Sequence, residues 1–342
     1  IKMTKRKIIT ICCLFICFLI AGNMPSIAQT PRIDSLSRLL KTAKEDTAKA
    51  NLLNELARAH LFELNDISMM YTYGAQELKL SRQLNYKKGI AYGLMHIGIF
   101  KRSHGEYKEA ISYAEQSLVL LEDIGFKKGE ASCYINLGVA YLDISNYPKS
   151  IEFTIKGMIL KEEIGDKKGA AIAANNLAEI FIDQGNYKEA LKYLSKSLRF
   201  GEETGDRVSV ALAYENIGRI SYTQGKFDEA LEYFKKAAKI SEELDDKMGM
   251  ASNYSHLGNT YFEKNKMDDA FTYQLKSLKI AEGYKDKIAV AKAYNSFGAI
   301  YIKKRNHHLA IAYFNKSIGL SRQIDSKQGM LKKKKKLVEV YK

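Results

Sequence analysis

The sequence predicts an all-α protein, an α-solenoid of tandem antiparallel helix pairs, because three sets of residues recur every forty positions. A small residue returns without insertion at Gly98, Gly138, Ala178, Gly218, Gly258 and Gly298. A second small residue follows in each copy at Ala110, Ser150, Ala190, Ala230, Ala270 and Ala310. An aromatic residue follows at Tyr113, Phe153, Tyr193, Tyr233, Tyr273 and Tyr313. Exact periods of roughly 20–50 residues indicate stacked supersecondary units rather than one closed globule.

The composition suits a helical array that does not bind nucleic acid. Of the 342 residues, 46% are apolar and 27% are charged, which suffices for a continuous core and a solvated surface. The net charge of +15 gathers at the ends, since residues 1–28 contribute +4 and residues 332–342 contribute +5, which leaves +6 for the body between them. Nucleic-acid binding requires a basic face rather than basic ends. We therefore expect a protein or an extended peptide as the partner, and no nucleic acid.

Residues 1–28 have the order of a secretory signal peptide. Lys5-Arg6-Lys7 precedes an apolar run over 8–21 that is too short for a comfortable membrane span. Ser26-Ile27-Ala28 then forms a small-x-small cleavage site. We expect cleavage after Ala28 and an exported protein, periplasmic or extracytoplasmic. An uncleaved N-terminal membrane anchor is the alternative.

Cysteine usage predicts an exported protein that holds together without disulfides. Cys12, Cys13 and Cys17 lie inside the predicted signal peptide, so Cys133 is alone in the mature chain. In the other repeats its position holds glycine, alanine or asparagine. We therefore interpret Cys133 as a small packing residue rather than a nucleophile.

Seven repeats and two terminal segments follow the signal peptide. Residues 29–45 are predicted to form an N-terminal capping helix, because Leu36, Leu39 and Leu40 have helical spacing and an array end exposes an apolar face. Residues 326–342 begin an eighth helix, which is either a cap or a truncated eighth repeat. Its run Lys332–Lys336 is either a solvated face or a juxtamembrane basic segment. The seven repeats span about 46–85, 86–125, 126–165, 166–205, 206–245, 246–285 and 286–325.

The copy at 126–165 predicts how each repeat folds. The apolar spacing predicts helix A over about 128–143 and helix B from about Pro148 to Ile164. Gly165 then ends helix B, because the left-handed conformation at a helix C-terminus favours glycine. An acid stands where each following helix A needs an N-cap acceptor. These acids are Asp166, Asp206, Asp246 and Asp286.

The recurring glycine predicts close packing of the two helices. A mid-helix glycine costs up to ~1 kcal/mol relative to alanine, so its regular return requires a packing reason. We expect helix B to approach helix A at this point, with the Ala110 set allowing the same from the facing helix. The Tyr113 set is expected to fill the space between successive repeats. Gly218→Leu should therefore destabilise the fold, whereas Lys226→Leu on the turn should not.

These residues resemble the tetratricopeptide-repeat family over about 46–342. The resemblance rests on L-G-x-x-Y at Leu137-Gly138-Tyr141, on the alanine at Ala190 and on the aromatic at Phe234. The usual early tryptophan and closing proline are absent, so helix B runs longer, as in the forty-residue variants of the family. The resemblance implies a right-handed superhelix with helices A lining a concave groove. Behind a signal peptide, such arrays are similar to the extracytoplasmic regions of bacterial sensor histidine kinases.

Catalytic and metal-binding patterns are missing from the sequence. No two of the six histidines have the i, i+4 spacing of a helical zinc site. Glutamate pairs such as Glu202-Glu203 recur at the ends of helix B, where solvated side chains are expected. The chain has no phosphate-binding glycine loop and no G-x-S-x-G. We therefore expect no enzyme, no cofactor and no metal.

The candidate ligand-binding residues lie two positions before each helix-A glycine and beside that position. In the tetratricopeptide family this position faces the concave groove, and a carboxamide there offers a donor and an acceptor to the backbone of an extended peptide. Glu215 and Arg219 have i, i+4 spacing and are expected to pair with each other. The candidate residues are His96, Asn136, Asn175, Asn176, Glu179, Asn216, Arg219, His256, Asn259, Asn295 and Ser296.

Two hypotheses for function follow. The first is a non-enzymatic exported scaffold that holds a peptide or protein partner in its concave groove, in its more specific form the ligand-binding part of a signal-transduction protein. The second is an envelope assembly adaptor that acts through its convex surfaces. The sequence names neither the partner nor the oligomeric state.

Overall fold

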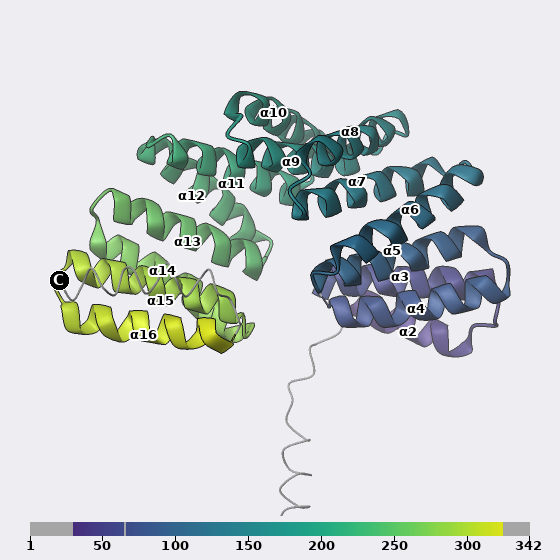
Figure 1. Cartoon of the computed structure of the whole chain (residues 1–342), viewed down its shortest axis with the longest axis horizontal. Helices are drawn as coiled ribbons and strands as arrows, with labels where there is room; N and C mark the ends of the chain where they lie inside the picture. The colour runs from purple at the N-terminus through teal and green to yellow at the C-terminus, as the bar shows by residue number, and fades with distance from the viewer. Residues whose placement is uncertain (1–29, 65, 324–342) are drawn as a thin grey trace, which may run out of the picture. The chain divides into compact units, whose positions relative to one another are not determined.

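The computed structural model describes residues 30–64 and 66–323, and these residues form fifteen α-helices with no strand among them (Figure 1). This confirms the predicted all-α class. The predicted signal peptide and the segment 326–342 lie outside the described residues. The helices are α2 (Pro31–Thr42), α3 (Thr47–Leu64), α4 (Ile67–Gln83), α5 (Lys87–Ser103), α6 (Tyr107–Asp123), α7 (Lys127–Asp143), α8 (Tyr147–Glu163), α9 (Lys167–Asp183), α10 (Tyr187–Thr204), α11 (Arg207–Thr223), α12 (Phe227–Glu243), α13 (Lys247–Glu263), α14 (Met267–Gly283), α15 (Lys287–Lys303) and α16 (His307–Gln323).

The chain divides into two compact units, of which the first ends at Gly129 and the second begins at Glu130. In unit 1, each helix from α3 to α6 packs against the next, and α3 also contacts α5. Helix α2 packs against α3 through Ile33, which is fully buried with Leu56 and Ala59. The apolar side of the first repeat is thus covered by the preceding helix.

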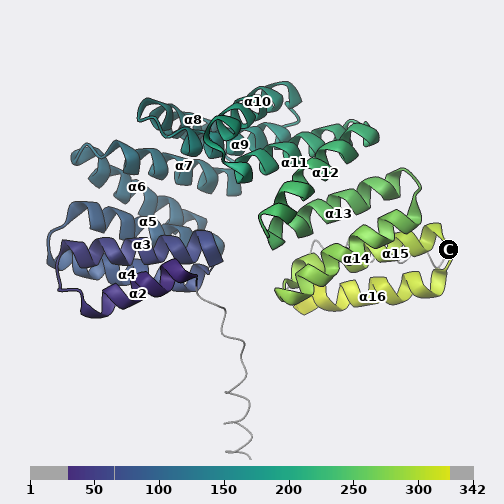
Figure 2. The same ribbon diagram turned by 180° about the vertical axis from the view of Figure 1, so that it is seen from behind.

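Unit 2 arranges its helix pairs in two layers (Figure 2). The A helices α9, α11, α13 and α15 each contact the next A helix, which makes one layer. The B helices α10, α12, α14 and α16 each pack against the A helix of their own repeat. This consecutive packing of helix pairs is the predicted solenoid arrangement.

The predicted N-cap acids start three of the four A helices. Asp166 and Asp246 accept hydrogen bonds from the backbone N–H groups of Gly169 and Gly249, at 2.8 and 3.1 Å. Asp286 caps α15 in the same way, through the N–H groups of residues 288 and 289.

Asp206 departs from the predicted capping pattern, because its carboxylate makes no capping hydrogen bond to α11. Instead it accepts from the hydroxyl of Ser209 at 2.7 Å and lies 3.6 Å from Lys168 Nζ. Ser209 stands where the sister repeats have Gly169 and Gly249, and its hydroxyl draws the carboxylate away from the backbone.

The turns between helices place one residue in the left-handed conformation, as the glycine pattern predicts. Gly165 has φ of +75° and Gly205 has φ of +67°. The same turn position is also filled without glycine, by Asp245 and Lys285 among others, at φ of +53° and +55°. Forty-residue spacing is therefore kept even where the turn residue carries a side chain.

The recurring helix-A glycine lies against a helix-B side chain, which confirms its predicted packing role. A Cβ on Gly218 would lie 2.8 Å from two ring atoms of Phe234, and a Cβ on Gly298 would lie 2.5 Å from Phe314 Cε1. Both phenylalanines are fully buried. The facing residue is therefore four positions beyond the Ala110 set, and its size differs between repeats.

The aromatic set also makes ring contacts inside each repeat. Five of the six rings lie against an aromatic ring on helix A of their own repeat, and Tyr193 and Tyr233 pack on a cluster shared by two successive repeats, as predicted. Phe153 stacks on Tyr141 with ring centroids 5.5 Å apart, and Tyr273 stacks on Tyr261 at 5.4 Å. Helices A and B of one repeat face each other across a short turn. Aromatic residues on the facing sides of these two helices therefore come into contact.

Candidate functional site

A continuous row of exposed and half-buried side chains runs across the A helices of unit 2, and we call it the helix-A face. Along each helix its members are spaced by three or four residues, so they share one side of that helix. They are Ile172, Asn176 and Glu179 on α9; Val208, Leu212, Asn216 and Arg219 on α11; Met248, Ser252, His256 and Asn259 on α13; and Ile288, Lys292 and Ser296 on α15.

The N-terminal half of the helix-A face is apolar and exposed. Leu212 is 43% exposed, Met248 47% and Ile288 55%, and Ile172 and Val208 lie beside them at 42% and 50%. Ile172 and Leu212 occupy one register position of their helices. Val208, Met248 and Ile288 occupy the position one helical turn before it. Contiguous apolar side chains at the surface, with polar groups alongside, mark interaction sites.

The C-terminal half of the helix-A face is polar, and its side chains connect successive repeats. Arg219 Nη1 lies 3.9 Å from Glu179 Oε1 of the preceding repeat. Ser296 Oγ donates to Asn259 Oδ1 of the preceding repeat at 3.5 Å. Part of the predicted binding stripe therefore serves to join one repeat to the next.

The expected pairing of Glu215 with Arg219 is corrected by these contacts. Glu215 Oε1 accepts a hydrogen bond from Ser252 Oγ at 2.8 Å and lies 3.4 Å from His256 Nε2, both on the next A helix. Arg219 donates to Asn216 Oδ1 at 2.9 Å on its own helix. The hydrogen bond and the ion pair of Glu215 therefore reach the next repeat.

The carboxylate of Glu215 is held ionised by this network. Burial by itself raises the pKa of Glu215, but the contacts with His256 and Ser252 and the charge of Arg219 outweigh it, so the net pKa lies below its usual value. A charged Glu215 beside His256 fixes the position of that imidazole. The imidazole ring of His256 also stacks on the ring of Phe234, with ring centroids 4.8 Å apart.

The predicted site residues divide into two groups in the structure. Asn136, Asn176, Asn216, His256, Asn259 and Ser296 are half-buried, Arg219 is partly exposed and Glu179 is exposed. By contrast, Asn175 is 5% exposed, and its amide donates to Ser197 Oγ at 2.8 Å and to the carbonyl of Ser209 at 3.1 Å. The Oδ1 atom of Asn295 is likewise buried. Asn175 therefore holds three helices together and is turned away from the helix-A face.

His96 belongs to the interior of unit 1. It is 4% exposed, and its Nδ1 atom lies 3.3 Å from Glu77 Oε2 on α4. Gly74 makes the room, since a Cβ there would lie 2.5 Å from His96 Cβ. Burial, and then the charge of Arg58, lower the pKa of His96 to about 4. His96 is thus a neutral core residue, although its sequence position matches that of His256.

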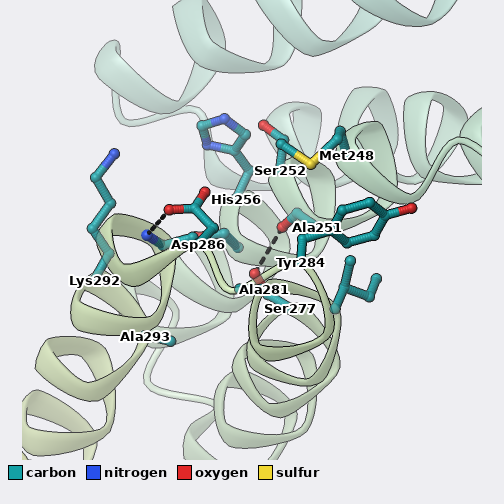
Figure 3. Close-up of a pocket in the computed structure, with 13 residues that line it drawn as sticks. Met248, Ala251, Ser252, His256, Ser277, Ala281, Tyr284, Asp286, Lys292 and Ala293 are labelled. Carbon is teal, nitrogen blue, oxygen red and sulfur yellow. Dashed lines mark hydrogen bonds between the residues drawn. The ribbon is translucent and has the colours of Figure 1, made fainter. Parts of the chain in front are cut away.

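A cavity of about 250 Å³ opens on the helix-A face between α13 and α15, and we call it the α13–α15 pocket. Its walls come from α13 and α15 and its floor from the C-terminal turn of α14. Figure 3 shows Lys292 and His256 on one side and Met248 and Tyr284 on the other.

Sequence reasoning missed the α13–α15 pocket, although one signal for it was present. At the position of Ser252 and Lys292, the two preceding A helices carry the bulky apolar residues Ile172 and Leu212. At the place of the pocket a small and a flexible side chain thus replace the bulky apolar residue of the earlier repeats.

Metal and membrane features are also absent from residues 30–64 and 66–323. No group of three or more His, Cys, Asp or Glu side chains there could hold a metal ion. None of the helices in this part of the chain is both long and apolar enough to cross a lipid bilayer.

Comparison with known proteins relates part of the chain to a known repeat family. Residues 169–243 and 249–323 match the family model of the tetratricopeptide repeat. A search of curated proteins found no match.

Solved structures share the fold at low sequence identity. A signal-transduction ATPase of the STAND class from Pyrococcus horikoshii, with a tetratricopeptide-repeat sensor, is 16% identical with a TM-score of 0.65, over 94% of this chain and 51% of that one. The Rap protein complexed with competence and sporulation factor is 16% identical with a TM-score of 0.61, over 93% and 98%. NprR in complex with its cognate peptide NprX is 16% identical with a TM-score of 0.60, over 92% and 97%. Residues 169–243 and 249–323 thus match the tetratricopeptide repeat, and the chain shares the helix-pair fold of these solved structures.

Proposed function

We propose that the protein is a non-enzymatic scaffold that holds an extended peptide or protein segment along the helix-A face of unit 2. The observation that carries this proposal is the row of exposed apolar side chains beside polar ones. Three successive A helices carry the exposed side chains Leu212, Met248 and Ile288. A partner that covers these side chains gains binding free energy, because it removes apolar surface from water.

The polar half of the helix-A face provides contacts to a peptide backbone. The amide of Asn176 offers both a donor and an acceptor, while Asn216 keeps its N–H donors because Arg219 occupies its Oδ1 atom. Each amide contact contributes a net of about 1 kcal/mol, less the cost of ordering the peptide. The structures of NprR with its cognate peptide and of the Rap protein with competence and sporulation factor support the proposal, because proteins of this fold hold such partners.

The proposal is tested with peptides selected from a random phage-displayed library on the wild-type protein. We expect Leu212→Gln to weaken binding of a selected synthetic peptide about fivefold or more in fluorescence anisotropy, because an apolar contact is lost. The triple change of Asn136, Asn176 and Asn216 to alanine should weaken it further.

The matched control is Leu191→Gln, which changes an equally exposed leucine on the B helix α10 (39% against 43% exposed). We expect this variant to bind as the wild type does. Stronger loss with Leu191→Gln than with Leu212→Gln would assign binding to the B helices and contradict the proposal.

The proposal places the scaffold outside the cytoplasm, as the ligand-binding part of a signalling protein. Its support is the signal-peptide pattern of residues 1–28 and, for signalling, the sensor role of the repeats in the Pyrococcus horikoshii ATPase. Mass spectrometry of protein recovered from the cell envelope should find Gln29 at the N-terminus. Recovery of Lys5-Arg6-Lys7 in that protein would favour the membrane anchor instead.

A further inference from the structure

We propose that the α13–α15 pocket is the anchor subsite of the helix-A face, and that it takes one large apolar side chain of the bound peptide with an acidic residue next to it. This inference rests on the proposed function and adds the peptide sequence that the site selects.

The size of the pocket suits one side chain. At about 250 Å³ it is smaller than the ~300–1,000 Å³ of pockets that hold whole drug-sized ligands. It also opens onto the surface along which the peptide lies, between two A helices of the same face. A leucine, methionine or phenylalanine of a peptide crossing α13 and α15 can therefore enter it while the backbone stays outside.

The walls of the pocket are apolar where a side chain would rest. They are formed by small residues from all three helices, with Met248, Ile280 and the ring of Tyr284 around them. The small residues are Ala251, Ala281, Ala289 and Ala293. Burial of an apolar side chain against such walls stabilises a complex in proportion to the area removed from water.

Most polar groups of the pocket are already used within the protein. Ser277 Oγ donates to the carbonyl of Ala251 at 2.8 Å, and Ser252 Oγ donates to Glu215 at 2.8 Å (Figure 3 shows the first of these). The carboxylate of Asp286 accepts from two backbone N–H groups at the start of α15. These groups leave the interior of the pocket to apolar atoms.

The rim of the pocket carries an exposed cation. Lys292 is exposed on α15, and Figure 3 shows it on the same side of the pocket as Asp286 and His256. The carboxylates of Glu215 and Asp286 are turned toward donors of the protein, Ser252 and the start of α15, whereas the ammonium of Lys292 is exposed and can pair with an acid of the peptide. Charge complementarity therefore favours an aspartate or glutamate beside the anchor residue.

The test uses Ser252→Leu, which gives α13 the residue that α11 carries at the same level. Leu212 is exposed there, so the change is compatible with the fold, and the new side chain fills the pocket. Peptides selected on the wild type should contain a large apolar residue beside an acid. The affinity of a synthetic consensus peptide should fall about tenfold or more on Ser252→Leu. Replacing the apolar residue of the peptide by alanine should have little further effect on this variant.

A second variant, Lys292→Glu, tests the rim without touching the core. We expect up to about a fivefold loss of affinity, as for an exposed ion pair, and recovery when the peptide acid is replaced by lysine. Leu191→Gln serves as the control, and thermal unfolding checks that each variant is folded.

The results separate this inference from the proposed function. If selected peptides bind and Leu212→Gln weakens them while Ser252→Leu and Lys292→Glu do not, the anchor subsite is wrong and the scaffold proposal stands. Selected peptides without a shared apolar residue would also contradict the anchor subsite and leave the scaffold proposal in place. If the wild type selects no peptide, both proposals fail.

Discussion

Gly218→Leu is expected to lower the free energy of unfolding by more than about 2 kcal/mol. The cause is overpacking, because even a Cβ at this position would lie 2.8 Å from two ring atoms of Phe234, which is fully buried. The leucine can be accommodated only if α11 and α12 separate or the ring leaves its position. Urea unfolding followed by circular dichroism measures the change.

Two controls relate this loss to packing. Gly319→Leu introduces the same residue near the C-terminal end of α16, where a Cβ meets nothing within 4 Å, and should stabilise by up to ~1 kcal/mol through helix propensity. The double variant Gly218→Ala with Phe234→Leu recreates the pair Ala178 and Leu194 of the preceding repeat. Its cost should be smaller than the sum of the single changes by at least ~0.5 kcal/mol. Additive costs would show that these two positions do not form a packing pair.

Glu77→Gln is expected to stabilise unit 1 at neutral pH, because ionising a buried acid whose pKa is raised on folding costs stability. Glu77 is 1% exposed, and burial, together with the charge of Glu55, raises its pKa well above 4.5. Its Oε2 atom lies 3.3 Å from His96 Nδ1, yet neither atom makes a hydrogen bond. The amide has the size of the carboxyl group without its cost of ionisation.

The pH dependence has a definite sign. An acid with a raised pKa in the folded state contributes fully below its unfolded pKa of 4.5, and this contribution is lost as pH rises to the folded value. Wild type and Glu77→Gln should therefore have similar stability near pH 4 and diverge above it. His96 acts in the opposite direction in both proteins, because its pKa falls from 6.5 to about 4 and stability is lost as pH falls through that window.

Denaturant titrations at several pH values test this expectation. Glu109→Gln, an exposed carboxylate on α6, should change stability by less than about 0.5 kcal/mol at every pH. If Glu77→Gln destabilised the protein at pH 7, the pair Glu77–His96 would be a buried ion pair rather than a neutral one.

The sequence by itself determined the helices, their register and their contacts within one repeat. The forty-residue period predicted helix A at 128–143 and helix B at 148–164, and α7 and α8 follow these bounds to within one residue. It also predicted the close approach at Gly218, because helix–helix packing across a short turn depends on residues near each other in the chain. Local periodicity, caps and turns carry this information directly.

Only the tertiary structure decided which polar side chains face a partner. Asn175 and Asn176 are adjacent in sequence, yet one is hydrogen-bonded inside unit 2 and the other lies on the helix-A face. His96 and His256 share one register position, but the first is buried against Glu77 and the second is half-buried beside Glu215. The physical reason is that such contacts join different helices, so they depend on how the neighbouring helices are placed and on how large their side chains are. The α13–α15 pocket likewise forms among side chains of three helices, at a place where α13 carries Ser252.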